Sequence, residues 1–315
     1  MFEQVYDQSV LKQPFAMVLE GGGGKGAYEV GVYNYLCEIG MNQSIAAISG
    51  SSVGAINLCI FTQPDTNLGD TVWRNIEPRF FLRLDARYFG MNDGLFGREG
   101  LIELMDENLD YKYITNSKIP LYVGLSDYGQ DEFSEPTARY YKLNGETPER
   151  IRKAILASSA LPAVYQPVEI DGSIYRDGGL VDNLPIEPLY RDGFRRFLVI
   201  GLRPGIKIKY DQYPDAEFMV IKPFESLGDE LTGTMDFTKE GARWRIRFGY
   251  EDAKRFFQYY HSPQASEPGF DEHMRFLARQ TYYDIRNQLG TDDRINRLES
   301  MVQRNIDKIN ELYNL

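Results

Sequence analysis

Short apolar runs alternate with helical patterns near the start of the chain. The run 15–20 (FAMVLE) is typical of a buried strand, and the spacing of apolar residues over 27–39 predicts a helix after it. A second apolar run, 45–48, leads into another helical pattern over 55–62. Because strands that alternate with helices form parallel sheets, this opening predicts an α/β fold whose central sheet is mostly parallel and flanked by helices.

The pattern continues less regularly to about residue 221. The stretch 63–117 is irregular apart from a short helix predicted over 98–108. The later predicted elements are strands over 120–125, 138–143, 196–202 and 217–221, a helix over 148–157, and a hairpin over 168–175 whose turn is Asp171-Gly172. The strand 138–143 is the expected partner of the strand 120–125. All of these elements fit one sheet with helices packed on it.

The character of the chain changes near residue 227. Helical patterns fill 240–260, 271–289 and 292–315, and apolar residues recur at near-heptad spacing in the last of them. Such a stripe is typical of a helix that packs against its own domain or against a second copy of the chain. We therefore divide the chain into an α/β domain over 1–226 and a helical C-terminal extension over 227–315 packed on it, and these helices are where we expect any homo-oligomer to form.

Composition narrows the range of partners. The 315-residue chain has a net charge of −11, which disfavours binding to nucleic acid and weakens attraction to anionic membranes. Its 22 tyrosines and 18 phenylalanines can still supply an apolar surface for transient contact with a membrane or micelle. No stretch approaches the roughly 18 consecutive apolar residues of a membrane span, and the N-terminus does not have the pattern of a signal peptide. Cys37 and Cys59 fall on predicted core-facing helix positions, so we expect free thiols and a cytoplasmic location.

A glycine-flanked serine joins the second predicted strand to its helix. Residues 50–54 read Gly-Ser-Ser-Val-Gly, which matches the G-x-S-x-G pattern with Ser52 at its centre. Between a strand and a helix this pattern is typical of a nucleophile elbow, where the turn is so sharp that glycine is needed on both sides of the serine. Ser51 fits less well, because the residues two positions away from it are not glycine. An ordinary tight turn is the alternative interpretation, and the strand–turn–helix context favours a catalytic Ser52.

A run of glycines, 21–26, connects the first strand to the first helix. The run is not a Walker A loop, because Lys25 is followed by glycine and the position five before Gly24 is leucine. It fits the letters of a dinucleotide fingerprint, but the next strand ends in Ser49-Gly50 rather than in the acid that holds the ribose, which disfavours that interpretation. Consecutive glycine amides at a helix N-terminus can also form an oxyanion hole. A turn built for close packing needs one or two glycines, so four glycines favour the oxyanion hole.

The base that would activate Ser52 is not an obvious histidine. The sequence contains two histidines, His261 and His273, and neither follows a predicted strand. Asp177-Gly178-Gly179 directly follows the predicted hairpin, and its two glycines allow the chain to turn tightly around the carboxylate. A buried carboxylate with a raised pKa can act as a general base and form a two-residue dyad with a serine. An ordinary Asp-Gly-Gly turn is the alternative interpretation.

Taken together, the three motifs resemble the patatin-like phospholipase family. The resemblance rests on GGGxKG at 21–26, GxSxG at 50–54 and DGG at 177–179, with further similarity at 158–162 and 183–185, and it covers roughly residues 15–203. It implies a three-layer fold, action on lipid acyl esters, and no cofactor or metal. The site residues that it implies are Ser52 as nucleophile, Asp177 as base, the backbone amides of Gly22, Gly23, Gly24 and Lys25 as the oxyanion hole, and Gly21, Gly26, Gly50, Gly54, Gly178 and Gly179 as motif glycines.

The resemblance defines the expected activity. We expect a lipid acyl hydrolase of the phospholipase A, lysophospholipase or esterase type that works through an acyl-enzyme, with the α/β domain as its catalytic domain. Two alternatives remain: an acyltransferase that passes the same acyl-enzyme to an alcohol, and a catalytically silent module that binds lipid or regulates a partner.

Overall fold

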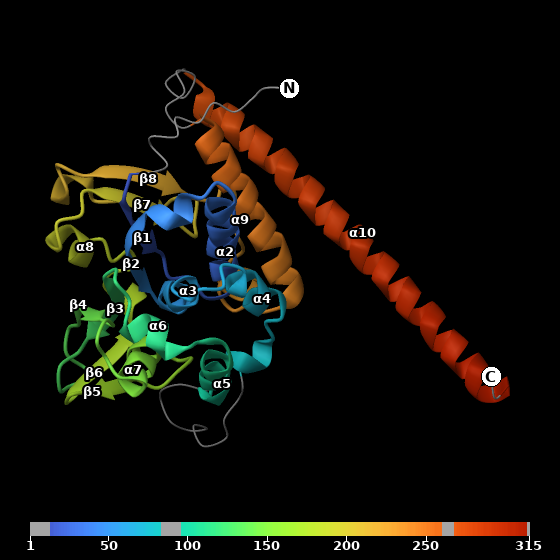
Figure 1. Cartoon of the computed structure of the whole chain (residues 1–315), viewed down its shortest axis with the longest axis horizontal. Helices are drawn as coiled ribbons and strands as arrows, with labels where there is room; N and C mark the ends of the chain where they lie inside the picture. The colour runs from blue at the N-terminus through green and yellow to red at the C-terminus, as the bar shows by residue number, and fades with distance from the viewer. Residues whose placement is uncertain (1–12, 83–95, 260–267, 314–315) are drawn as a thin grey trace.

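The centre of the protein is one eight-stranded sheet (Figure 1). The computed structural model describes residues 13–82, 96–259 and 268–313, with the backbone alone for Leu231 and residues 292–313. The strands are β1 (Phe15–Leu19), β2 (Ile45–Ser51), β3 (Leu121–Asp127), β4 (Thr137–Lys142), β5 (Val168–Ile170), β6 (Ser173–Asp177), β7 (Arg196–Ile200) and β8 (Glu217–Ile221). Each strand predicted from the sequence is confirmed, as is the hairpin of β5 and β6.

The order of strands in the sheet is β5-β6-β3-β2-β1-β7-β8, with β4 also paired to β3. The neighbours from β3 through β2, β1 and β7 to β8 are all parallel, whereas β4, β5 and β6 are antiparallel additions at the β3 end. The prediction of a mostly parallel sheet is therefore confirmed.

Helices cover both faces of the sheet. In β1, alternate residues point to opposite faces: Met17 belongs to the larger core cluster and Val18 to the smaller one. The larger cluster joins the sheet to most of the helices, whereas α8 covers the smaller cluster (Figure 1). The helices are α2 (Ala27–Glu38), α3 (Val53–Phe61), α4 (Leu68–Arg74), α5 (Glu99–Asn108), α6 (Tyr111–Thr115), α7 (Pro148–Ser158), α8 (Glu187–Arg191), α9 (Lys239–Tyr259) and α10 (Phe270–Tyr313). The short helices α4 and α6 lie in the stretch that the sequence analysis left irregular.

The helix α9 packs tightly along α2. Two glycines allow this approach: a β-carbon at Gly31 would lie 1.9 Å from the carbonyl oxygen of Ile246, and one at Gly249 would lie 2.0 Å from that of Tyr28. Ile246 and other residues of α9 belong to the same core cluster as α2. The division of the chain near residue 227 stays a prediction, but α9 is packed directly on the α/β domain.

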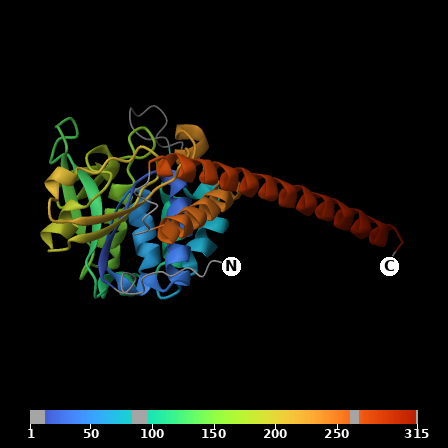
Figure 2. The same cartoon turned by 90° about the horizontal axis from the view of Figure 1, so that it is seen from above.

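The last helix, α10, is continuous. The sequence analysis divided this region into two helices, over 271–289 and 292–315, and that division is wrong. Gly290 lies inside the helix, where a glycine costs about 1 kcal/mol relative to alanine but does not prevent helix formation. Met274, Ala278 and Tyr282 are buried against the body of the protein. Figure 2 shows the C-terminal part of α10 projecting away from the body.

Two other findings complete the fold. Cys37 and Cys59 are both free, as predicted. Within the described ranges, no helix combines the length and the apolar character that a membrane span requires.

Candidate active site

Ser52 lies at the sharp turn between β2 and α3, in a backbone conformation that is rare for residues with a side chain. Its φ is 55° and its ψ is −122°. The flanking glycines are required by packing, because a β-carbon at Gly50 would lie 2.3 Å from the carbonyl oxygen of Gly54. One at Gly54 would lie 2.6 Å from the carbonyl oxygen of Leu19. This is the geometry of a nucleophile elbow, with strain stored at the serine.

The strand β3 brings Ser52 and Asp177 together. Along β3, Gly124 pairs with Ser51 of β2, and the next residue, Leu125, pairs with Asp177 of β6. The strand β4 occupies one edge of β3 over its whole length, so β2 and β6 share the other edge. Because β2 runs parallel and β6 antiparallel to β3, their carboxyl ends meet head to head.

The side chains of Ser52 and Asp177 are joined by a hydrogen bond. Ser52 Oγ donates to Asp177 Oδ2 at 2.7 Å, and the backbone amide of Gly179 donates to Asp177 Oδ1 at 2.8 Å. Burial raises the pKa of the Asp177 carboxyl to about 6, and these two hydrogen bonds limit the rise. A carboxylate with this pKa, in contact with a hydroxyl, has the geometry and the basicity of a general base.

A second serine, Ser158, holds the backbone of the elbow in place through its hydroxyl. Ser158 Oγ accepts a hydrogen bond from the backbone amide of Ser52 at 2.8 Å and donates to the carbonyl oxygen of Gly124 at 2.7 Å. The sequence analysis quoted Ser158 in a similarity motif but assigned it no role. Ser51 points elsewhere, since its hydroxyl donates to the carbonyl oxygen of Asp182 at 2.9 Å.

The glycine loop runs beside Ser52 and leads directly into α2. Residues Gly23–Gly26 form a short 3-10 helix, η1, that continues into α2 at Ala27. The backbone of Gly22 and Gly23 lines the same pocket as Ser52. The amide of Lys25 was expected in the oxyanion hole, but it donates to the carbonyl oxygen of Gly22 at 3.2 Å. Of the four backbone amides predicted for the oxyanion hole, those of Gly22, Gly23 and Gly24 stay a prediction.

Close packing requires more of these glycines than we expected. Packing does not need only one or two glycines here, because several positions in the loop are in tight contact with other segments. A β-carbon added at Gly21 would lie 2.4 Å from Asn183 Oδ1, and one added at Gly22 would lie 2.8 Å from Leu202 Cδ1. β-carbons added at Gly23 and Gly24 would lie 2.1 and 2.0 Å from the carbonyl oxygens of Thr234 and Asp236. One added at Gly26 would lie 2.5 Å from Val53 Cγ2.

A buried polar network connects the glycine loop to the segment after Asp177. Asn183 Nδ2 donates to the carbonyl oxygen of Gly21 at 2.9 Å and to Glu20 Oε1 at 3.2 Å. Glu20 is almost completely buried, and burial raises the pKa of its carboxyl. Its other partners are the backbone amide of Leu202 at 2.6 Å and the guanidinium of Arg203 at 2.8 Å. The sequence signal for this network was a glutamate at the end of an apolar strand.

The two aspartates nearest to Asp177 in the sequence, Asp171 and Asp182, have partners other than Ser52. Asp171 lies in the β5–β6 turn and pairs with Arg150 at 2.6 Å. The carboxylate of Asp182 accepts a hydrogen bond from the hydroxyl of Tyr140 at 2.7 Å. His273 is exposed on α10, and His261 lies outside the described residues.

Ser52 and Asp177 lie at a pocket of about 450 Å³ whose walls are mainly apolar. Four chain regions contribute the walls: α3 with the residues after the short 3-10 helix η3 (Pro78–Phe80), the segment after α7, the turn after β6, and the segment before α9. Their apolar members are Val53, Ile56, Phe81, Leu82, Leu161, Val164, Tyr165, Leu180, Met235 and Phe237. The site therefore places a hydroxyl, a carboxylate and a glycine loop beside space for an apolar chain.

Comparisons with known proteins identify the family of the chain. A family model described as patatin-like phospholipase matches residues 17–190. Lysophospholipase NTE1 of Cryptococcus neoformans is 26% identical over 192 residues, which cover 60% of this chain and 11% of NTE1. The uncharacterized protein YjjU of Escherichia coli is 29% identical over 197 residues, which cover 60% of this chain and 52% of YjjU. The chain thus spans only part of each of these relatives.

Among solved structures, VipD from Legionella pneumophila aligns with a TM-score of 0.42 at 14% identity, covering 96% of this chain and 80% of VipD. The family match extends over more than half of the chain, and it includes the glycine loop, Ser52 and Asp177. The resemblance noted in the sequence is thereby confirmed: the chain belongs to the patatin-like phospholipase family.

Proposed function

We propose that this protein is a lipid acyl hydrolase with Ser52 as nucleophile and Asp177 as general base. Asp177 takes the hydroxyl proton as Ser52 Oγ attacks the acyl carbonyl carbon, and the amides of residues 22–24 stabilise the negative charge that develops on the carbonyl oxygen. The alcohol or lysolipid leaves with the proton from Asp177, and an acyl-enzyme forms. Water, deprotonated by Asp177, then releases the fatty acid and regenerates Ser52.

The 2.7 Å hydrogen bond between Ser52 Oγ and Asp177 Oδ2 carries this proposal. It supports direct proton transfer without a histidine between the two residues. The pKa of Asp177, raised by burial to about 6, supports a base that is ionised at neutral pH and yet more basic than an ordinary aspartate.

The surroundings of the dyad support a lipid substrate. The pocket walls are mainly apolar, and Leu180, next to the Asp-Gly-Gly turn, lines the pocket while 44% of its surface remains exposed. Val181 beside it is 40% exposed. Exposed apolar side chains at the mouth of an apolar pocket favour contact with a lipid surface. The name of one relative, lysophospholipase NTE1, supports the same substrate class.

Hydrolysis of lysophosphatidylcholine and of p-nitrophenyl butyrate by the purified chain tests this function. We expect fatty acid release by the wild type, and loss of activity of at least about 10³-fold in Ser52→Ala and in Asp177→Asn. A fluorophosphonate probe should label the wild type on Ser52 and leave Ser52→Ala unlabelled.

The matched control is Ser51→Ala, one position away. Ser51 is buried and its hydroxyl bonds to the carbonyl oxygen of Asp182, so this variant should keep its labelling and most of its activity. Near-normal hydrolysis by Ser52→Ala or Asp177→Asn would remove that residue from the dyad. A wild-type protein that binds lipid but releases no fatty acid would reject the proposed function.

A further inference from the structure

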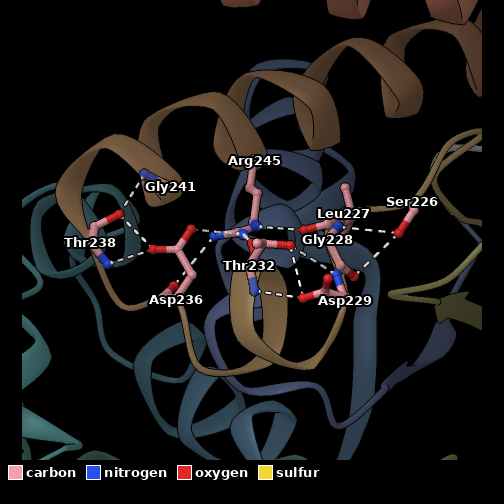
Figure 3. Close-up of polar contacts among 9 residues, drawn as sticks. All are labelled: Ser226, Leu227, Gly228, Asp229, Thr232, Asp236, Thr238, Gly241 and Arg245. Atoms are coloured by element: carbon pink, nitrogen blue, oxygen red, sulfur yellow. Dashed lines mark hydrogen bonds and ion pairs between the residues drawn. The ribbon is translucent and has the colours of Figure 1, made fainter.

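Arg245 is completely buried in α9, although arginine is seldom fully buried unless it is paired. Its guanidinium donates hydrogen bonds to the carbonyl oxygens of Leu227, Thr232 and Asp236 at 3.1, 2.6 and 3.3 Å. It also forms an ion pair with the Asp236 carboxylate at 3.0 Å. Figure 3 shows the side chain reaching from α9 into the loop formed by these residues. One side chain therefore connects three points of the segment 227–236, which we call the cover segment, to α9.

The cover segment is also braced by its own hydrogen bonds. Asp229 Oδ1 accepts from the backbone amide of Thr232 at 2.7 Å. At the other end, Asp236 Oδ1 accepts from Thr238 Oγ1 at 2.6 Å, and Thr238 Oγ1 accepts from the backbone amide of Gly241 at 3.0 Å in the first turn of α9 (Figure 3). These bonds fix the shape of each end of the segment separately. Arg245 binds residues at both ends and so links one end to the other.

The cover segment lies directly on the glycine loop. A β-carbon at Gly23 would be 2.1 Å from the carbonyl oxygen of Thr234, and one at Gly24 would be 2.0 Å from that of Asp236. The contact is reciprocal, since a β-carbon at Gly233 would be 2.5 Å from Cε of Lys25. Arg245 binds one of these two carbonyl oxygens, that of Asp236. Thr234 lies between Thr232 and Asp236, and Arg245 binds the carbonyl oxygens of both.

A loop of consecutive glycines has little ability to hold one conformation by itself, because glycine is the least restricted residue. Its shape must come from what packs on it. On one side, Asn183 bonds to the carbonyl oxygen of Gly21. On the side of Gly23 and Gly24, the cover segment supplies the contact.

We propose that Arg245 is a positioning residue of the oxyanion hole, which holds the cover segment against Gly23 and Gly24 and so keeps the loop backbone in place beside Ser52. The inference rests on the proposed function, and it gives the C-terminal extension a part in catalysis. Arg245 does not touch the substrate; it acts through the carbonyl oxygens that it binds.

Kinetics of Arg245→Met and Arg245→Lys in the full chain test this inference. An oxyanion hole acts on the transition state and not on bound substrate, so its distortion lowers kcat and leaves KM nearly unchanged. With p-nitrophenyl butyrate, whose short acyl chain makes little use of the pocket walls, we expect kcat of Arg245→Met to fall about 10- to 100-fold. KM should change less than about threefold. Arg245→Lys keeps a donor at the same place and should recover part of the lost kcat.

The matched control is Arg255→Met in the same helix. Arg255 is also a buried arginine, paired with Asp252 at 2.7 Å and bonded to Thr281 of α10, but it makes no contact with the cover segment among the contacts described for the chain. It should lower the melting temperature and leave kcat of the folded protein unchanged. Circular dichroism at the assay temperature establishes that each variant is folded.

The outcomes separate the two proposals. If the wild type hydrolyses the ester and Arg245→Met keeps kcat within about threefold, the inference is overturned while the proposed function stands. If Arg255→Met loses as much kcat as Arg245→Met, the effect is general loosening of the fold and the inference is likewise overturned. If Arg245→Met does not fold, a folded Arg245→Lys with wild-type kcat overturns it, and one with kcat lowered about 3- to 10-fold supports it. A wild type that is neither active nor labelled by fluorophosphonate rejects the proposed function and this inference with it.

Discussion

Ser52 and Asp177 are 125 positions apart in the sequence, and their side chains share a hydrogen bond of 2.7 Å. The register of β3 explains the meeting, because Gly124 pairs with Ser51 and Leu125 pairs with Asp177. β2 and β6 end facing each other beside the same strand, β3, so the residues at their carboxyl ends lie close together. The position of Asp177 relative to Ser52 thus depends on the pairing of β6 with β3.

The pH dependence of catalysis should report the pKa of Asp177. A base must be ionised to accept the Ser52 proton, and burial raises the pKa of this carboxyl to about 6. We expect kcat/KM for p-nitrophenyl butyrate to rise about tenfold per pH unit below pH 6 and to level off above it. A flat profile between pH 4 and 8 would contradict Asp177 as the base, and Ser52→Ala gives the background rate at each pH.

The same pKa predicts a stability gain in Asp177→Asn. A buried carboxyl whose pKa is higher in the folded than in the unfolded state favours folding when protonated and opposes it when ionised. Replacing it by a neutral amide should therefore raise the free energy of unfolding by about 1–3 kcal/mol at pH 8. The gain should disappear as the pH falls from about 6 to about 4. Urea unfolding at pH 8 and pH 4 measures both values, and a variant less stable than the wild type at pH 8 would contradict the prediction.

Much of the sheet could be predicted from the sequence, because buried strands of a parallel sheet are short apolar runs that end where the chain must turn. The three motifs sit at such strand ends, and for that reason Ser52, Asp177 and the glycine loop could be named in advance. The division of α10 failed for the opposite reason. Gly290 weakens a helix locally, but a helix of this length tolerates it.

The supporting residues could not be predicted, because their function depends on contacts between distant segments. Ser158 bonds to the amide of Ser52 across 106 positions, and Asn183 bonds to the carbonyl oxygen of Gly21 across 162. Arg245 lies in a stretch with an ordinary amphipathic helical pattern, and this pattern does not indicate that the arginine side chain is buried. The reason for glycine at positions 23 and 24 likewise depends on where the cover segment lies.

Gly24→Ala should damage both the fold and the site. The new β-carbon would lie 2.0 Å from the carbonyl oxygen of Asp236, so either the glycine loop or the cover segment must move. We expect a loss of about 1–3 kcal/mol in the free energy of unfolding. We also expect about a 10²-fold fall in kcat, because the change displaces one of the amides proposed for the oxyanion hole.

The control for Gly24→Ala is Gly205→Ala. Gly205 is exposed, and a β-carbon there would have open space around it. Its unfolding free energy should stay within about 0.5 kcal/mol of the wild type, with unchanged kcat. Urea unfolding and ester hydrolysis on both variants decide the matter, and a fully active, fully stable Gly24→Ala would show that the contact with Asp236 does not constrain the loop.

Substitutions at Gly290 should test the continuity of α10 without touching the site. Apart from the neighbouring backbone of its own helix, no atom of the described residues would lie within 4 Å of a β-carbon at this position, so the prediction rests on helix propensity. Gly290→Ala should raise helix content slightly, by removing about 1 kcal/mol of unfavourable propensity, whereas Gly290→Pro should interrupt the helix at a cost of about 3 kcal/mol. Far-UV circular dichroism at 222 nm measures the difference between the two variants. Ester hydrolysis should be equal in both, because the buried residues Met274, Ala278, Tyr282 and Ile285 of α10 all precede Gly290 and keep their packing. Identical circular dichroism in wild type, alanine and proline variants would mean that the helix is already broken at this position in solution, as the two-helix interpretation of the sequence had it.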